Sequence, residues 1–367
     1  MLDAFWSGVG EELARRWVAR VLTPALAFWV GGLSLLWWDV HRAGVAASGW
    51  VAEITRTAEQ LGRLPVLVQG ALVVGGLVVV AASAVVAERL TVPVLRFLEG
   101  YWARPQWLRR RMVTHRQRRY EKARNRARSL QLRQRRGRLS VAEYAELRQL
   151  RQDPARDPQR RTELESAAAD ALTAQEATQL GKDLQWLRTT PDRDELRMPT
   201  RLGDALRAAE RRPVTSYGMD AVVCWNALWH TLPQQARTEL SQARAALDTA
   251  ARGWLWGVLF LVWTPLSWWA VPIGVLIPVV SYWFGIVPRG IAFGRLIVTC
   301  YDLYRFNLYD ALHLPRPESP EQERTKAGPR VTAALWGTLA EAGLRYRFDP
   351  VPESPVNNDP PPAIQVL

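Results

Sequence analysis

Cysteine and histidine are scarce in this chain of 367 residues, and their scarcity excludes several classes of function. Cys224 and Cys300 are the only cysteines, too few for a disulfide framework or a zinc cluster, so we expect two reduced thiols. None of the four histidines falls in a metal-ligand spacing, and Cys224 and His230 do not share a helix face. No GxSxG, phosphate-loop or GxGxxG pattern occurs. The sequence therefore predicts no metal, no cofactor and no enzyme, with a hidden activity in residues 199–233 as the alternative.

Lysine is almost absent, at positions 122, 182 and 326 only, whereas arginine is abundant. A GC-rich genome produces this ratio without selection for guanidinium chemistry, so we interpret the arginines as charge. Segment 104–138 holds fifteen Lys and Arg residues and a single acid, Glu121, while the net charge of the whole chain is +13. Because the rest of the chain is nearly neutral, this excess predicts one localised anionic surface as its partner.

Charge is missing altogether from three long stretches, which predict membrane spans. Residues 21–38 form an uncharged run of 18 residues, and residues 65–87 form one of 23. The third run, 253–288, has 36 residues and would be about 54 Å long as one straight helix, far more than a bilayer core of about 30 Å requires. We therefore expect it to fold into two short spans.

The break in the third run is expected at 265–272, where Pro265 and Pro272 disfavour an uninterrupted helix. A re-entrant pair that never crosses fully is the alternative. A cleaved signal peptide is the alternative for the first run, which is long and tryptophan-rich for an h-region. Tryptophan pairs suit the interface at the ends of these spans, and the expected interfacial anchors are Trp37, Trp38, Trp268 and Trp269.

The distribution of arginine near the span ends predicts the orientation. Twelve arginines flank the spans on the side of the termini, and three lie on the opposite side, at positions 42, 56 and 63. Because positive charge is retained in the cytoplasm, both termini and the large central region should be cytoplasmic, in a bacterial inner membrane.

The predicted fold is therefore an all-α integral membrane protein with four transmembrane helices and a helical cytoplasmic domain between spans 2 and 3. The expected order is a cytoplasmic N-terminal tail (1–20), a first span (21–38), an extracytoplasmic loop (39–64), a second span (65–87), an arginine-rich helical cytoplasmic domain (88–252), a transmembrane hairpin (253–288), cytoplasmic amphipathic helices (289–348) and a disordered proline-rich tail (349–367).

Helix signals are frequent in the cytoplasmic region. Residues 104–136 predict one helix that ends at Gly137, and Ser140 with Glu143 forms a capping box for the next, so we expect these two helices to pair as a hairpin. Thr200 should cap a helix that Pro213 ends. An apolar stripe at Val222, Trp225, Trp229 and Leu232 predicts the helix after it.

Residues 234–252 are strongly helix-forming and contain no breaker before Gly253. We therefore expect this helix to continue directly into the third span, where it could carry a displacement of the cytoplasmic domain into the membrane hairpin. Residues 289–314 are amphipathic and aromatic, which favours an interfacial helix under the membrane.

The basic segment has three interpretations. A polybasic stretch next to a span gains about 1 kcal/mol for each base near an anionic headgroup, and we favour this one. A solvated helix face that only sets topology is the second, and nucleic acid is disfavoured because few aromatic residues lie nearby for stacking. The residues expected to contact lipid or another polyanion are Arg109, Arg110, Arg111, Arg116, Arg118, Arg119, Arg124 and Arg126.

Polar and small residues inside the runs are few, and no ionisable side chain lies in mid-span, which argues against a proton-coupled transporter. Those that could line a pore or let helices pack closely are Gln69, Gly75, Gly76, Ser83, Thr264 and Ser281. Self-association into a homo-oligomer and ordinary packing within one chain would give the same pattern.

Four segments carry a resemblance: LGDALRAAE, YGMDAVVCW, the tryptophan-rich stretch 254–283 and LYRFNLYDALHLPRP. They resemble uncharacterised bacterial multi-span membrane proteins of GC-rich, actinobacterial type, and the resemblance implies no activity. The functional hypothesis is a scaffold or sensor whose basic domain associates with membrane lipids; its protein partner is unknown. An oligomeric ion channel or membrane-disrupting effector is the alternative.

Overall fold

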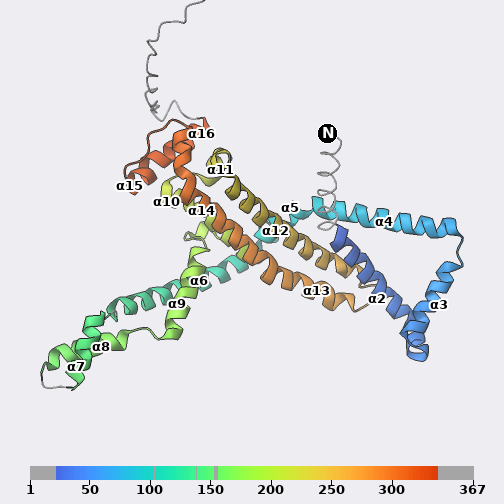
Figure 1. The fold of residues 1–367 in the computed structure, drawn as a ribbon, viewed down its shortest axis with the longest axis horizontal. Helices are drawn as coiled ribbons and strands as arrows, with labels where there is room; N and C mark the ends of the chain where they lie inside the picture. Colours follow the sequence, from blue (N-terminus) through green and yellow to red (C-terminus); the bar gives the residue numbers. More distant parts are fainter. Residues whose placement is uncertain (1–21, 103, 138, 153–155, 338–367) are drawn as a thin grey trace, which may run out of the picture. The chain divides into compact units, whose positions relative to one another are not determined.

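The computed structural model describes residues 22–102, 104–137, 139–152 and 156–337, and within these ranges it contains helices and no strand (Figure 1). The prediction of an all-α protein is confirmed. The predicted tails at 1–20 and 349–367 lie outside the described residues. The chain divides into two compact units, the first made of residues up to Arg211 together with Gln234–Val298, the second of Arg212–Pro233 together with the residues from Thr299 onward.

The first unit opens with four helices: α2 (Thr23–Ser48), α3 (Trp50–Gly62), α4 (Val66–Arg89) and α5 (Thr91–Glu99). The segment 39–64, expected as a loop, is largely helical; it contains no proline, and Gly44 lies within α2. Gly49 has a φ of 84°, a conformation that favours glycine, and it separates α2 from α3.

The arginine-rich region contains α6 (Gln106–Arg136), α7 (Val141–Gln152), α8 (Pro158–Asp170), α9 (Ala174–Arg188) and the short η2 (Asp194–Leu196). The end of α6 at Gly137 is confirmed, and so is the capping box, in which the Ser140 and Glu143 backbone N–H groups donate to each other's side chains. The expected pairing of α6 with α7 is wrong. α6 packs along α9 and α7 packs on α8, since each pair buries its own leucine cluster.

Helix α10 (Arg201–Tyr217) is capped by Thr200, whose hydroxyl accepts from the Gly203 N–H, as expected. Pro213 does not end it. The helix runs on to Tyr217 and stops at Gly218, which has a φ of 72°. In α11 (Ala221–Thr231) the buried face is Ala221, Cys224 and Leu228. The predicted apolar stripe is buried only in part: Leu232 is buried and the two tryptophans are half-buried, whereas Val222 is 73% exposed.

Helix α12 (Gln234–Leu259) continues through η3 (Phe260–Trp263), and this confirms an uninterrupted helix into the third apolar run. The chain then turns at residues 264–269, within most of the expected break at 265–272. It returns as α13 (Ala270–Val280), the π-helical η4 (Ser281–Ile286) and α14 (Val287–Ala311). Residues 289–311 therefore extend the helix of the hairpin instead of forming a separate one. α15 (Pro320–Gln322), η5 (Glu323–Ala327) and α16 (Gly328–Trp336) follow.

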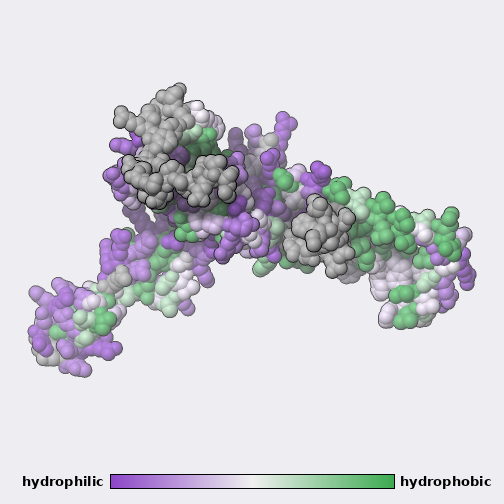
Figure 2. All heavy atoms as spheres, turned by 45° about the horizontal axis from the view of Figure 1, so that its top comes forward, coloured by the Kyte–Doolittle hydropathy of each residue, from purple (hydrophilic) through white to green (hydrophobic). Residues whose placement is uncertain are grey.

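Three helical stretches among the described residues are long and apolar enough to cross a membrane: Val66–Arg89, Gln234–Trp263 and Ala270–Ala311. A membrane location is therefore indicated, whereas a count of four spans is not confirmed. The first predicted span, 21–38, is not among them; position 21 lies outside the described residues, and α2 begins at Thr23. Figure 2 shows hydrophobic residues gathered over α4 and hydrophilic residues over α6 to α8.

Candidate functional site

The candidate site is the outer face of α6, and its geometry follows from what the inner face buries. Tyr120, Ala123, Ala127 and Leu130 are the buried residues of α6. Ala127 and Leu130 pack with Leu180 of α9, so one side of a 31-residue helix faces protein and the other is left to the surroundings.

Arginines beside the buried stripe are held by acids of neighbouring elements. The Arg126 guanidinium donates to both carboxylate oxygens of Asp183, at 2.6 and 2.8 Å, and Asp183 is 5% exposed. The Asp183 bond raises the pKa of Arg126. Arg133 donates to Glu176 at 2.6 Å. Glu176 also closes the capping box of α9, and the backbone N–H of Thr173, with Arg133, lowers its pKa.

Arg116 forms the most buried of these contacts. Its Nε and Nη2 atoms donate to one oxygen of Asp204, at 2.8 and 2.5 Å, while the other oxygen accepts from the Met198 N–H at 2.8 Å. Asp204 is fully buried, and this desolvation raises its pKa although Arg116 opposes the shift. The pair joins α6 to the start of α10.

Aromatic rings contact three further guanidinium groups nearby. The Cζ atom of Arg119 lies 5.7 Å from the centroid of the Trp186 ring, and that of Arg201 lies 5.4 Å from the same ring. Arg197 stacks on Tyr120 at 3.9 Å and pairs with Asp194 at 3.0 Å. Cation–π attraction of this kind orders α6, α9 and the 189–204 segment as one assembly.

Eight of the other bases of α6 lie on the outer face in two rows, and Arg109 is exposed near the start of the helix. Within the described residues no carboxylate pairs with any of them. One row has spacings of 14, 4 and 7 residues and the other 7, 4 and 14, so each follows one side of the helix. The first row consists of Arg110, Arg124, Arg128 and Arg135, and the second of Arg111, Arg118, Lys122 and Arg136.

The eight arginines expected to contact a polyanion therefore fall into two groups, one bound to other side chains and one exposed. Arg116 and Arg126 are bound to acids and Arg119 to Trp186, while Arg109, Arg110, Arg111, Arg118 and Arg124 are exposed. Sequence reasoning missed Asp183 and Asp204 as their partners. A local signal existed for Asp183, which lies beside the helix face of Leu180, Leu184 and Leu187.

A close backbone contact lies at the base of this assembly. The Thr200 hydroxyl donates to the Glu99 carbonyl at 2.9 Å, and a Cβ on Gly203 would lie 2.0 Å from that same oxygen. The Arg201 N–H donates to the hydroxyl of Tyr282 at 3.2 Å. The end of α5, the start of α10 and the π-helical segment η4 thus meet at one junction.

The residues considered for a pore do not converge. Gln69 donates to the carbonyls of Leu61, Gly62 and Leu64 and closes the turn before α4. Ser83 accepts from Trp29 of α2, and Ser281 donates to the Ala250 carbonyl of α12. Thr264 is exposed at the turn of the hairpin, and a Cβ on Gly75 or Gly76 would meet open space. Pore lining and helix association stay predictions.

Of the expected anchors, Trp37 and Trp38 lie within α2, and Trp268 and Trp269 lie at the turn of the hairpin. Trp37 donates to Thr57 of α3 at 3.2 Å and stacks on His41, and Trp38 is 45% exposed. Trp268 and Trp269 are exposed at the turn of the hairpin, with ring centroids 4.4 Å apart.

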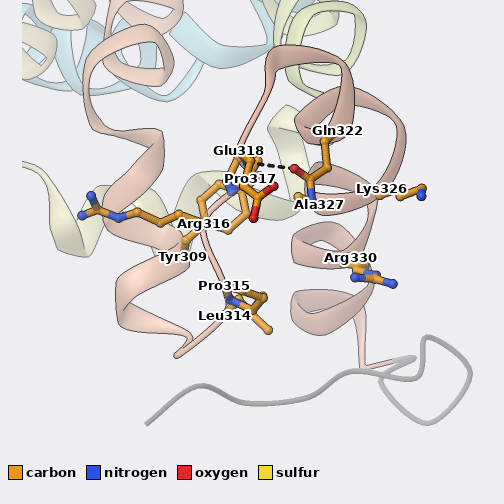
Figure 3. A pocket seen from close by; sticks show the side chains of 10 residues that line it. All are labelled: Tyr309, Leu314, Pro315, Arg316, Pro317, Glu318, Gln322, Lys326, Ala327 and Arg330. Carbon is orange, nitrogen blue, oxygen red and sulfur yellow. Dashed lines mark hydrogen bonds between the residues drawn. The ribbon is translucent and has the colours of Figure 1, made fainter. Parts of the chain in front are cut away.

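The other candidate sites are weak. Among the described residues no group of His, Cys, Asp or Glu has the geometry to hold a metal ion. Cys224 is fully buried while His230 is exposed. The second unit has a pocket of about 380 Å³ between Tyr309, the 314–318 segment and η5. Its basic side chains, Arg316, Lys326 and Arg330, point away from a common centre (Figure 3).

Comparison with known proteins assigns the chain to no family. No family model matches the chain, no curated protein is similar to it, and no solved structure resembles it. The resemblance to bacterial multi-span membrane proteins stays a prediction.

Proposed function

We propose that the protein is a non-catalytic scaffold or sensor of the bacterial inner membrane, in which the outer face of α6 associates with anionic lipid headgroups. The observation that carries this proposal is the division of charge on α6. Bases on the protein side are neutralised by Asp183, Glu176 and Asp204, whereas no described carboxylate pairs with the two outer rows, and Glu121 is the one acid of α6. A charge excess retained on one face of one helix favours a flat anionic partner.

Lipid is a better partner than nucleic acid for this face. Binding to single-stranded nucleic acid uses aromatic rings that stack on bases. Tyr120 is 8% exposed, so Trp107 is the one exposed aromatic residue of α6 among those described. If half of the eight bases in the outer rows reach headgroups, the electrostatic attraction to the membrane is about 4 kcal/mol.

We propose four membrane spans: α2, α4 and the two arms of the hairpin. Phe28 and Trp29 of α2 pack against Trp256, Phe260 and Trp263 of the hairpin, so α2 runs beside an apolar helix along its first half. Leu35 packs near Ala270, which puts the turn of the hairpin level with the end of the first predicted span. A hairpin that packs along α2 as far as Leu35 favours full crossing over a re-entrant pair. α6 and α3 then lie on opposite sides, α6 in the cytoplasm with both termini.

The junction at Gly203 could transmit a movement of α6 to the membrane hairpin, as a sensor requires. α6 is bound to α10 through Asp204, α10 contacts the end of α5 at Glu99, and its first N–H reaches Tyr282 in the hairpin. α5 also packs on α12, the helix that continues into the membrane. A movement of α6 toward headgroups would therefore displace the hairpin.

Energy transfer from a fluorophore at Ser129→Cys to a headgroup-labelled lipid tests the lipid contact in nanodiscs that hold the full chain. We expect transfer to be greater with phosphatidylglycerol than with phosphatidylcholine and to fall at high salt, because salt screens exposed charges. The variant R110Q/R124Q/R128Q/R135Q should lose the difference. The control R148Q/R156Q/K182Q/R188Q removes as many exposed bases elsewhere and should keep it.

Equal transfer in both lipids would contradict the proposal. Salt-sensitive capture of single-stranded DNA by the same face, without a lipid preference, would favour a nucleic acid partner instead.

A further inference from the structure

Helix α3 has an apolar face that no protein element covers. Trp50, Ile54, Ala58 and Leu61 follow one another at spacings of 4, 4 and 3 residues and share one side of the helix. All are exposed, Trp50 by 64%, Ile54 by 48% and Leu61 by 54%, and no residue of α3 is buried. The charged residues Arg56, Glu59 and Arg63 occupy the opposite side.

Hydrogen bonds tie α3 to both of its neighbouring helices. Thr57, in its second half, accepts from the indole N–H of Trp37 of α2. At its C-terminal end, the Gln69 amide of α4 donates to the carbonyls of Leu61, Gly62 and Leu64. α3 joins the far ends of α2 and α4 (Figure 1), and Trp50, Ile54 and Leu61 stay exposed beside these contacts.

The surface is continuous with a membrane-crossing helix. α4 begins at Val66, four residues after α3 ends, and both Val66 and Leu67 are 85% exposed. α4 is one of the three helices long and apolar enough to span, so its first residues face lipid at the same level as the end of α3. A short helix with one apolar and one charged face, ending beside a span, fits the boundary between headgroups and acyl chains.

We infer that α3 is an interfacial helix on the side opposite to α6, with Trp50, Ile54 and Leu61 inserted among the lipid acyl chains. Trp50 lies at its start, and tryptophan prefers this boundary. Inserted in this way, α3 holds the N-terminal end of α4 at a fixed depth through the Gln69 bonds. This contact requires no anionic lipid, so it is independent of the proposed role of α6.

Nitroxide labels at Ile54→Cys and Glu59→Cys test the inference in the full chain, reconstituted in phosphatidylcholine vesicles. Ile54 is on the apolar side and Glu59 on the charged side, and neither makes a side-chain bond in the structure. We expect the Ile54 label to be relaxed more by oxygen, which partitions into acyl chains, and the Glu59 label more by an aqueous nickel chelate. The unsubstituted protein gives the blank for the native cysteines.

Two results would overturn it. If the nickel chelate relaxes both labels equally, α3 lies in water. If neither reagent reaches the Ile54 label, the face is packed against protein, such as a second copy of this chain. A failure of α6 to bind headgroups would change neither measurement.

Discussion

Arg116 of α6 donates two hydrogen bonds, at 2.8 and 2.5 Å, to one carboxylate oxygen of Asp204, which is fully buried at the start of α10. These residues are 88 positions apart in the chain. Their contact joins the arginine-rich helix to the junction with α5 and the hairpin, so the account depends on it for both stability and coupling.

Loss of Arg116 should be costly. In Arg116→Ala the Asp204 carboxylate stays buried without its partner, which costs about 3–5 kcal/mol in the free energy of unfolding. Arg110→Ala, on the outer face of the same helix, should cost no more than about 0.5 kcal/mol. Chemical denaturation in detergent micelles measures both. Equal stability of the two variants would show that the buried pair contributes nothing.

The deficit of Arg116→Ala should shrink in acid. Burial raises the pKa of Asp204 already in the native protein, and without Arg116 the pKa rises further above that of the unfolded chain. A group with a raised pKa in the folded state binds protons on folding, so the variant gains stability relative to the native protein as the pH falls. Unfolding curves at pH 7 and pH 5 compare them, and a deficit that does not change between these pH values argues against a buried carboxylate.

The capping boxes should make α7 and α9 sensitive to acid in the opposite sense. Backbone N–H groups of Ser140 and Thr173 lower the pKa of Glu143 and Glu176. Their stabilisation is present above the unfolded pKa of about 4.3 and is lost as the pH falls through the lowered folded value. Hydrogen exchange at the first turns, corrected for intrinsic rates, should rise below that range. In Glu143→Gln and Glu176→Gln this added rise should be absent.

Gly203 should not tolerate a side chain. A Cβ there would lie 2.0 Å from the Glu99 carbonyl oxygen, so Gly203→Ala must separate α10 from α5 at a cost of about 1–3 kcal/mol. Gly181 in α9 has nothing within 4 Å, and Gly181→Ala should stabilise by about 1 kcal/mol. Thermal unfolding of the pair gives the comparison. A neutral Gly203→Ala would mean that the contact between α5 and α10 is loose.

Both native thiols should resist modification. Cys224 is fully buried and Cys300 is 4% exposed, and burial raises the pKa of Cys224 to about 11. The reactive thiolate is therefore scarce at pH 8. A disulfide reagent should label neither cysteine in the folded protein and both after denaturation. Rapid labelling of the native chain would show that the second unit opens.

Local signals were sufficient for much of the fold. Uncharged runs predicted α4 and the hairpin, the two prolines at 265 and 272 predicted its turn, and Ser140 and Gly137 predicted helix ends. Each of these depends on residues within one turn or one span. The first predicted span lies only partly within the described residues, so its crossing stays a prediction.

Long-range pairing could not be read from these signals. Asp183 and Asp204 neutralise arginines 57 and 88 positions away, and nothing near either aspartate in the sequence indicates its partner. The choice of α9 instead of α7 to cover α6 depends on which leucines meet, and the register of α11 on how its tryptophans fit their neighbours. Pro213 is tolerated within α10, which stops only at Gly218.

The most direct test of the central claim determines on which side of the membrane α6 and α3 lie. Single cysteines at Arg124→Cys in α6 and Glu59→Cys in α3 are treated with a membrane-impermeant maleimide in intact cells and again after permeabilisation. The account predicts that Glu59→Cys is labelled in intact cells and that Arg124→Cys is labelled only after permeabilisation. Labelling of Arg124→Cys from outside would contradict it.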